Sequence, residues 1–141
     1  MVTINATEAR KDWSLVVDHT IREKPQFIKR TRDRIMLADV NFIQELLFAY
    51  EFSAKSYVEK DGSVTLSLSE IDLAENGPTE QAARLQLGNA ILVYAEDFYD
   101  DFGYWSTAPN RTRHIPYVFK ALIINDAKKL GEMIKCQSGK N

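Results

Sequence analysis

The sequence predicts an α+β protein: a small α/β unit at the N-terminus, followed by a β-hairpin and a mainly helical C-terminal region. Three observations lead to this fold class. Apolar residues recur at helical spacing over 8–22 beside two short β-type segments. An Asp-Gly turn separates two alternating segments within 56–68. A long apolar stripe follows it at helical spacing. The 141 residues suffice for one or two small domains, and we expect domains at 1–52 and 53–141.

The first unit is expected to open with a short strand at 2–4 and a helix over 8–22. Asn5 and Thr7 are favourable N-caps. The helix should end at Lys24, because the residue before a proline avoids the helical conformation. Its buried stripe is predicted to comprise Ala9, Trp13, Val16, Val17 and Ile21.

A basic hairpin and a second helix complete this unit. Strands are predicted at 26–30 and 35–37, around a polar turn at 31–34. Asp39 is then expected to cap a helix that extends to residue 50 or 52. The predicted buried face of that helix consists of Phe42, Leu46, Leu47 and Tyr50.

The second half starts with a hairpin whose turn is Lys60-Asp61-Gly62. Alternation over 64–68 predicts a strand with one buried face. After a break at 76–79, a long helix is expected to continue to residue 101. Its core stripe is predicted to contain Leu87, Ile91, Tyr94, Phe98 and Phe102.

The C-terminal region is expected to contain a loop at 103–110 and two more helices. One should start at Pro116 and reach residue 124, because proline is favoured in the first helical turn. Asp126 should cap the other, through about Ile134, and a frayed tail should occupy 137–141.

Composition excludes several classes of protein. The 45% hydrophobic and 27% charged residues indicate a folded chain. Cys136 has no partner, which is typical of a reducing compartment. The N-terminus shows no signal peptide, and no apolar run is long enough to span a bilayer, so we expect a cytoplasmic protein without a membrane partner. Phosphate-binding and dinucleotide-binding glycine motifs are absent, so we expect no cofactor.

The net charge of −2 conceals a segregation along the chain. Residues 1–34 carry a net +3, residues 35–110 carry −10, and residues 111–141 carry +5. Such asymmetry favours a local nucleic-acid or partner surface. The N-terminal segment is the first candidate for a nucleic-acid contact.

One acidic group lies on the long predicted helix: Glu96, Asp97, Asp100 and Asp101. With His114 nearby, it could hold a divalent cation. A pair of these carboxylates could instead serve hydrolysis, which would require a pocket. The ordinary interpretation is a solvated helix face. Cys136 is interpreted as a buried or idle thiol, because no histidine-centred arrangement supports a nucleophile.

The basic residues of the first unit are the more informative group. Arg10 and Lys11 lie at the start of the first predicted helix, where the helix dipole disfavours cations unless an anion docks there. If helix and hairpin pack together, the cations could converge on one phosphate-contacting surface; the alternative is a solvated basic loop. The predicted DNA-contacting set is Arg10, Lys11, Lys29, Arg30, Arg32 and Arg34.

Residues 1–50 resemble the Phd/YefM-type antitoxin family. The resemblance rests on the opening 2–10 with its Glu-Ala-Arg element, on Pro25-Gln26-Phe27-Ile28-Lys29-Arg30, and on the strand-to-helix step over 35–42. It implies a dimer that binds operator DNA, with Arg10 as the best-supported contact. Residues 61–99 resemble the HicB antitoxin pattern through Asp61-Gly62 and the segment 77–82.

The resemblance implies a non-enzymatic antitoxin of a type II toxin-antitoxin system. Such a protein represses its own operator as a homodimer or higher oligomer and neutralises a cognate toxin by direct binding. The dimer core is expected to include Phe27, Ile28 and 35–37. An alternative is a protein-protein interaction module that does not bind DNA. Acidic residues around apolar anchors would suit a basic toxin, and the predicted toxin-binding set is Glu75, Glu80, Glu96, Asp97, Asp100, Asp101, Tyr99 and Trp105.

Overall fold

The computed structural model describes residues 1–139 and contains two compact units, Met1–Leu46 and Leu47–Asn141. Each unit has its own buried core. The division precedes residue 52 because Phe52 is buried in the core of the second unit.

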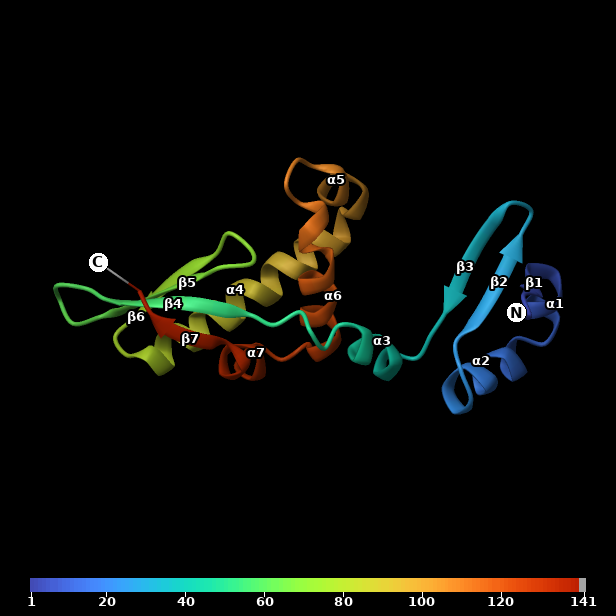
Figure 1. The fold of residues 1–141 in the computed structure, drawn as a ribbon, viewed down its shortest axis with the longest axis horizontal. Coiled ribbons are helices and arrows are strands. Elements are labelled where there is room, and N and C mark those ends of the chain that lie inside the picture. The colour runs from blue at the N-terminus through green and yellow to red at the C-terminus, as the bar shows by residue number, and fades with distance from the viewer. Residues whose placement is uncertain (140–141) are drawn as a thin grey trace. The chain divides into compact units, whose positions relative to one another are not determined.

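The first unit is built on a three-stranded sheet in the order β1-β2-β3 (Figure 1). Strand β1 (Ile4–Asn5) runs parallel to β2 (Gln26–Arg30), and β2 pairs antiparallel with β3 (Asp33–Leu37). The predicted hairpin is therefore present. The opening strand lies later than expected, at Ile4–Asn5 instead of 2–4. The helices of this unit are α1 (Ala6–Lys11), α2 (Trp13–Arg22) and α3 (Val40–Leu46).

The single helix expected over 8–22 is wrong, because two helices occupy this segment. Asp12 has φ −115° and ψ 40°, outside the helical region, so α1 ends before it and α2 begins after it. This break changes the phase of the apolar stripe. Ala9 and Val16 are buried as expected, whereas Trp13 is 50% exposed and Ile21 is also exposed.

Helix α3 is shorter than expected and contributes no buried residue. Its first turn is closed by the carbonyl oxygen of Asp39, which accepts the backbone N–H groups of Phe42 and Ile43. Leu46 and Tyr50 are exposed, so the expected buried face is wrong for the single chain. The small core of this unit is formed by α1, α2 and β2, which leaves α3 outside it.

The second unit contains a four-stranded sheet in the order β6-β5-β4-β7 (Figure 1). Strand β4 (Ser53–Val58) and β5 (Val64–Leu68) form the predicted hairpin, and Gly62 has a φ of +87° in its turn. Strand β6 (Ala74–Gly77) was not expected. Strand β7 (Lys135–Ser138) pairs parallel with β4, so the prediction of a frayed tail is wrong for residues 137–138. Residues 140–141 lie outside the described part.

Two helices of the second unit begin at side-chain caps, of which the cap at Asp126 was predicted. The Thr79 hydroxyl accepts the backbone N–H of Ala82 at 3.1 Å and starts α4 (Glu80–Asp100). The Asp126 carboxylate accepts the backbone N–H of Lys129 at 3.0 Å and starts α7 (Ala127–Met133). Helix α6 (Ile115–Ile124) carries Pro116 in its first turn. The loop expected at 103–110 is wrong, because residues there form α5 (Phe102–Thr107) and a 3₁₀ turn (Thr112–His114) follows.

Helix α4 is the centre of the core, packing against the sheet and against α6 and α7 (Figure 1). Leu87, Ile91 and Phe98 of its predicted stripe are fully buried. Two glycines allow α4 and α7 to approach closely. A Cβ at Gly88 would overlap the carbonyl oxygen of Ala127, and a Cβ at Gly131 would overlap the carbonyl oxygen of Arg84.

Candidate functional site

The predicted DNA-contacting residues are all exposed on the first unit. Arg10 and Lys11 lie in the last turn of α1, where the helix dipole favours cations. The prediction that Arg10 and Lys11 lie at a helix start is therefore wrong. The helix dipole gives no argument that an anion binds beside them. Lys11 forms an ion pair with Glu8, its Nζ lying 3.7 Å from Oε1.

The other four cations surround the tip of the β2–β3 hairpin. Thr31 adopts a φ of 56° in the turn, and Arg32 follows it. Lys29 and Arg34 are directly opposite partners across the two strands. Like charges opposite each other destabilise a sheet, so stability does not explain this pair.

The hairpin distributes its cations over both faces. Alternation places Lys29 and Arg34 on the face that carries Phe27, where the Arg34 guanidinium lies 5.0 Å from the ring centroid. Arg30 lies on the opposite face, that of Ile28, and its Nη2 is 3.8 Å from Oδ2 of Asp33. The structure therefore brings the cations together at one end of the hairpin, without gathering them on one flat face.

An apolar groove of ≈ 530 Å³ lies between α1 and the hairpin in the first unit. Trp13 and Ile35 line it and are 50% and 61% exposed. Arg10 lies on the same lining. Its complete lining is Ala6, Ala9, Arg10, Trp13, Ile28, Ile35, Met36 and Leu37.

The acidic residues of the predicted toxin-binding set fall into two groups on the second unit. Glu75 is half-buried in β6, and Glu80 lies in the first turn of α4, where its Oε2 is 3.4 Å from Nε of Arg84. The other group is Glu96, Asp97, Asp100 and Asp101, at the far end of α4. A rise of 1.5 Å per residue separates Glu80 from Glu96 by about 24 Å along the helix. One surface does not contain all six carboxylates.

The four carboxylates at the end of α4 are exposed, and the last turn of the helix contains no basic residue. The negative end of the helix dipole disfavours them. Among the ion pairs of residues 1–139, none includes these four side chains. In the same part of the chain, no group of three or more His, Cys, Asp or Glu side chains could hold a metal ion.

Aromatic side chains lie beside this acidic group. Tyr99 is 57% exposed, Phe102 38% and Tyr104 64%. Tyr99 and Phe102 both pack edge-on against Phe119 of α6, with ring centroids 6.2 Å and 6.0 Å away. Trp105, expected to be an exposed anchor, is instead half-buried against the core. Phe102 and Tyr104 were missed because one was assigned to the core stripe and the other to a loop.

A polar cluster fixes the region beneath α5. Buried His114, 3% exposed, has its Nδ1 2.7 Å from the Tyr94 hydroxyl. Arg111 approaches Oδ2 of Asp72 at 3.6 Å and lies 5.9 Å from the Trp105 ring centroid. Burial lowers the pKa of His114, and the Arg111 charge adds to this effect. Within residues 1–139, His114 does not form a metal-binding group with the carboxylates at the end of α4.

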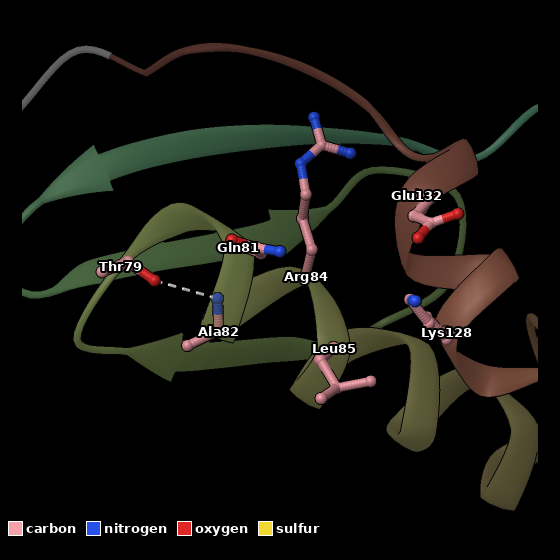
Figure 2. Close-up of a pocket in the computed structure, with 7 residues that line it drawn as sticks. All are labelled: Thr79, Gln81, Ala82, Arg84, Leu85, Lys128 and Glu132. Carbon is pink, nitrogen blue, oxygen red and sulfur yellow. Dashed lines mark hydrogen bonds between the residues drawn. The ribbon is translucent and has the colours of Figure 1, made fainter.

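Figure 2 shows a pocket of ≈ 340 Å³ beside the start of α4. The Thr79 hydroxyl on its wall is used by the N-cap of α4. The Arg84 guanidinium donates to the carbonyl oxygens of Gly131 and Ile134 at 3.0 Å and 2.7 Å. These groups hold helix ends, and we assign no ligand to the pocket. Its lining is Thr79, Gln81, Ala82, Arg84, Leu85, Lys128 and Glu132.

Burial also raises the pKa of the Cys136 thiol, which keeps it protonated. No helix within residues 1–139 has the length and apolar character needed to cross a membrane.

Comparison with known proteins defines the class of protein as an antitoxin of a toxin-antitoxin system. A family model described as PHD-like, "Antitoxin of toxin-antitoxin, RelE / RelB, TA system", matches residues 1–136, and the chain belongs to this family. No curated protein matches the chain.

The fold is similar to that of a solved structure from Syntrophomonas wolfei subsp. wolfei. That protein, determined at 1.80 Å resolution, is described as the antitoxin part of a proposed toxin/antitoxin system. The TM-score is 0.91 at 32% sequence identity, and the match covers 99% of this chain and 100% of the other. The predicted α+β fold and the resemblance to antitoxins are thus confirmed.

Proposed function

We propose that this protein is a non-enzymatic, cytoplasmic antitoxin of the Phd/YefM type. It binds operator DNA as a dimer through its first unit, represses its own transcription, and neutralises a toxin by direct contact with its second unit. The observation that carries the DNA-binding part is the apolar groove of the first unit, which is uncovered in the single chain and adjoins the exposed basic hairpin.

Dimerisation follows from how little the first unit buries. The apolar core of residues 1–46 consists of three buried side chains, those of Ala9, Val16 and Ile28. A unit with so small a core gains stability by association. Trp13 and Ile35 line the groove and are the apolar surface that a second copy would cover. Pairing about a two-fold axis would also present the basic hairpin twice, as a symmetric operator requires.

Full-length protein at micromolar concentration should therefore have the mass of a dimer or a higher oligomer in light scattering. Trp13→Glu places a charge in the groove and should shift that mass to the monomer. Leu85→Glu is the control, because Leu85 is an exposed apolar residue of the second unit. A strictly monomeric wild-type protein would remove the basis for symmetric operator binding.

The DNA contact is tested by the salt dependence of affinity for the protein's own promoter. Each phosphate contact contributes about 0.9 to the slope of log affinity against log salt. Arg10→Ala should weaken binding. The double variant Arg30→Ala/Arg32→Ala should lower the slope by the amount that about two phosphate contacts contribute. Lys60→Ala is a matched control, because Lys60 is an exposed cation at the hairpin turn of the second unit.

If the arginine variants and Lys60→Ala all bind like the wild type, the basic hairpin does not contact DNA. The protein would then be an interaction module that binds only its protein partner. That second candidate is favoured by the distribution of the hairpin cations over two faces.

A further inference from the structure

The exposed aromatic rings of the second unit form a patch that its own core does not explain. We define the aromatic patch as Tyr99 at the end of α4 and Phe102 at the start of α5, which both pack edge-on against Phe119. Folding normally leaves rings of this size buried, and clustered exposed aromatics mark interaction surfaces. Tyrosine in particular is enriched among the residues that dominate binding energy.

Helix α5 is held rigidly from below. Trp105 stacks on buried Phe98, with ring centroids 6.3 Å apart, and meets Tyr94 at the same distance. The Thr112 hydroxyl donates to the carbonyl oxygen of Ser106 at 2.7 Å. The patch is therefore preorganised, and a partner would not have to order it on binding. Trp105 belongs to this support, which explains its half-buried position.

Carboxylates surround the patch on its own elements. Glu96 and Asp100 are within one helical turn of Tyr99, and Asp101 precedes Phe102. These charges are unfavourable at a helix C-terminus, and they have no ion pair within residues 1–139. A cationic partner would neutralise them, whereas an anionic partner would be repelled.

We infer that the aromatic patch is the surface on which the toxin docks, and that the toxin meets it with an arginine-rich face. A guanidinium can stack on a tyrosine ring and pair with a neighbouring carboxylate at the same time. Such a face is the kind that holds a polyanionic substrate, so the antitoxin neutralises by covering it. This inference rests on the proposed function. It excludes Glu75, which lies in β6, and Glu80, which lies at the opposite end of α4.

The test uses the full-length chain and the purified toxin encoded in the same operon, by calorimetry and stopped-flow association. Tyr99→Ala should weaken binding at least about thirtyfold, as expected for a central aromatic anchor. The Tyr99 ring is 57% exposed, so the fold should persist, which circular dichroism checks. Leu85→Ala is the matched control, because Leu85 is an exposed apolar residue of the same helix.

The charges are tested separately, because they act on the encounter. Glu96→Gln/Asp100→Asn/Asp101→Asn should slow association about tenfold at low salt and flatten its salt dependence. Glu75→Gln/Glu80→Gln removes two carboxylates from the other group and should change neither.

The outcomes separate this inference from the proposed function. If the wild-type chain binds the toxin and the patch variants bind equally well, the docking surface is wrong while the antitoxin function stands. The same holds if Leu85→Ala or Glu75→Gln/Glu80→Gln weakens binding as much as the patch variants do. If the wild-type chain does not bind the toxin, the proposed direct neutralisation is itself wrong.

Discussion

Replacing Gly88 with alanine sets two physical effects against each other in the second unit. On an exposed helix, alanine in place of glycine stabilises by about 1 kcal/mol. Gly88, however, is buried where α4 crosses α7. The added Cβ would overlap the carbonyl oxygen of Ala127 and lie 2.8 Å from the backbone nitrogen of Gly131.

Both obstructing atoms belong to the backbone, so no side-chain rotation can relieve the overlap. Helix α7 would have to move away, which loosens the packing of buried Leu130. Overpacking of this kind costs roughly 1–3 kcal/mol, and occasionally more. Because the Cβ would overlap the Ala127 oxygen itself, we take a cost near the upper end of that range. Subtraction of the helix-propensity gain then leaves a fall of about 2 kcal/mol in the free energy of unfolding. For a unit of this size, this lowers the melting temperature by roughly 10 °C.

The assay is urea unfolding of the second unit, followed by Trp105 fluorescence in a Trp13→Phe background. Gly103→Ala is the control, because a Cβ at Gly103 in α5 meets nothing within 4 Å. This variant should raise the free energy of unfolding by up to about 1 kcal/mol, and the urea midpoint should rise slightly with it. If Gly88→Ala unfolds at the wild-type midpoint or above it, the close approach of α4 and α7 is wrong.

Three further changes should follow from contacts in the second unit. Burial lowers the pKa of His114, so below about pH 6.5 the unfolded chain binds a proton that the folded chain excludes. The free energy of unfolding should therefore decrease as the pH is lowered through this range. Urea titrations of His114→Asn should show a smaller decrease. Thr79→Ala removes the N-cap of α4 and should lose about 1 kcal/mol of stability, whereas Thr79→Ser should retain it, measured as urea midpoints. Arg84→Met leaves two carbonyl oxygens at the end of α7 without their donor, so thermal melts should show a loss of about 2 kcal/mol.

Local signals in the sequence predicted the parts of the fold that depend on neighbouring residues. The Asp61-Gly62 turn, the cap at Asp126 and the long stripe of α4 all act within a few residues. Each was found because its physical cause lies in the same short segment.

The elements that were missed depend on partners far along the chain. Strand β7 exists because Cys136 pairs with Ala54, across most of the second unit. Helix α5 is six residues long and is held by Trp105 against the core, so periodicity could not reveal it. Charge showed which segments are basic and acidic. Only the structure separates Glu80 from Glu96 and places Phe102 on the surface.

The residues whose burial was mispredicted carry a signal of their own. The apolar spacing that assigned Trp13, Ile21 and Leu46 to a core is real, yet these side chains are exposed in the single chain. A folded chain usually violates its local rules where it meets a partner. Phe102 follows the same logic in the second unit, since it extends the core stripe of α4 to the surface, next to carboxylates that the helix dipole disfavours. At the end of α4, an apolar residue of the core stripe is exposed, and carboxylates lie where the helix dipole disfavours them. This is why we infer the toxin contact there, and not around Glu75 and Glu80, where Glu75 is half-buried in β6 and Glu80 pairs with Arg84.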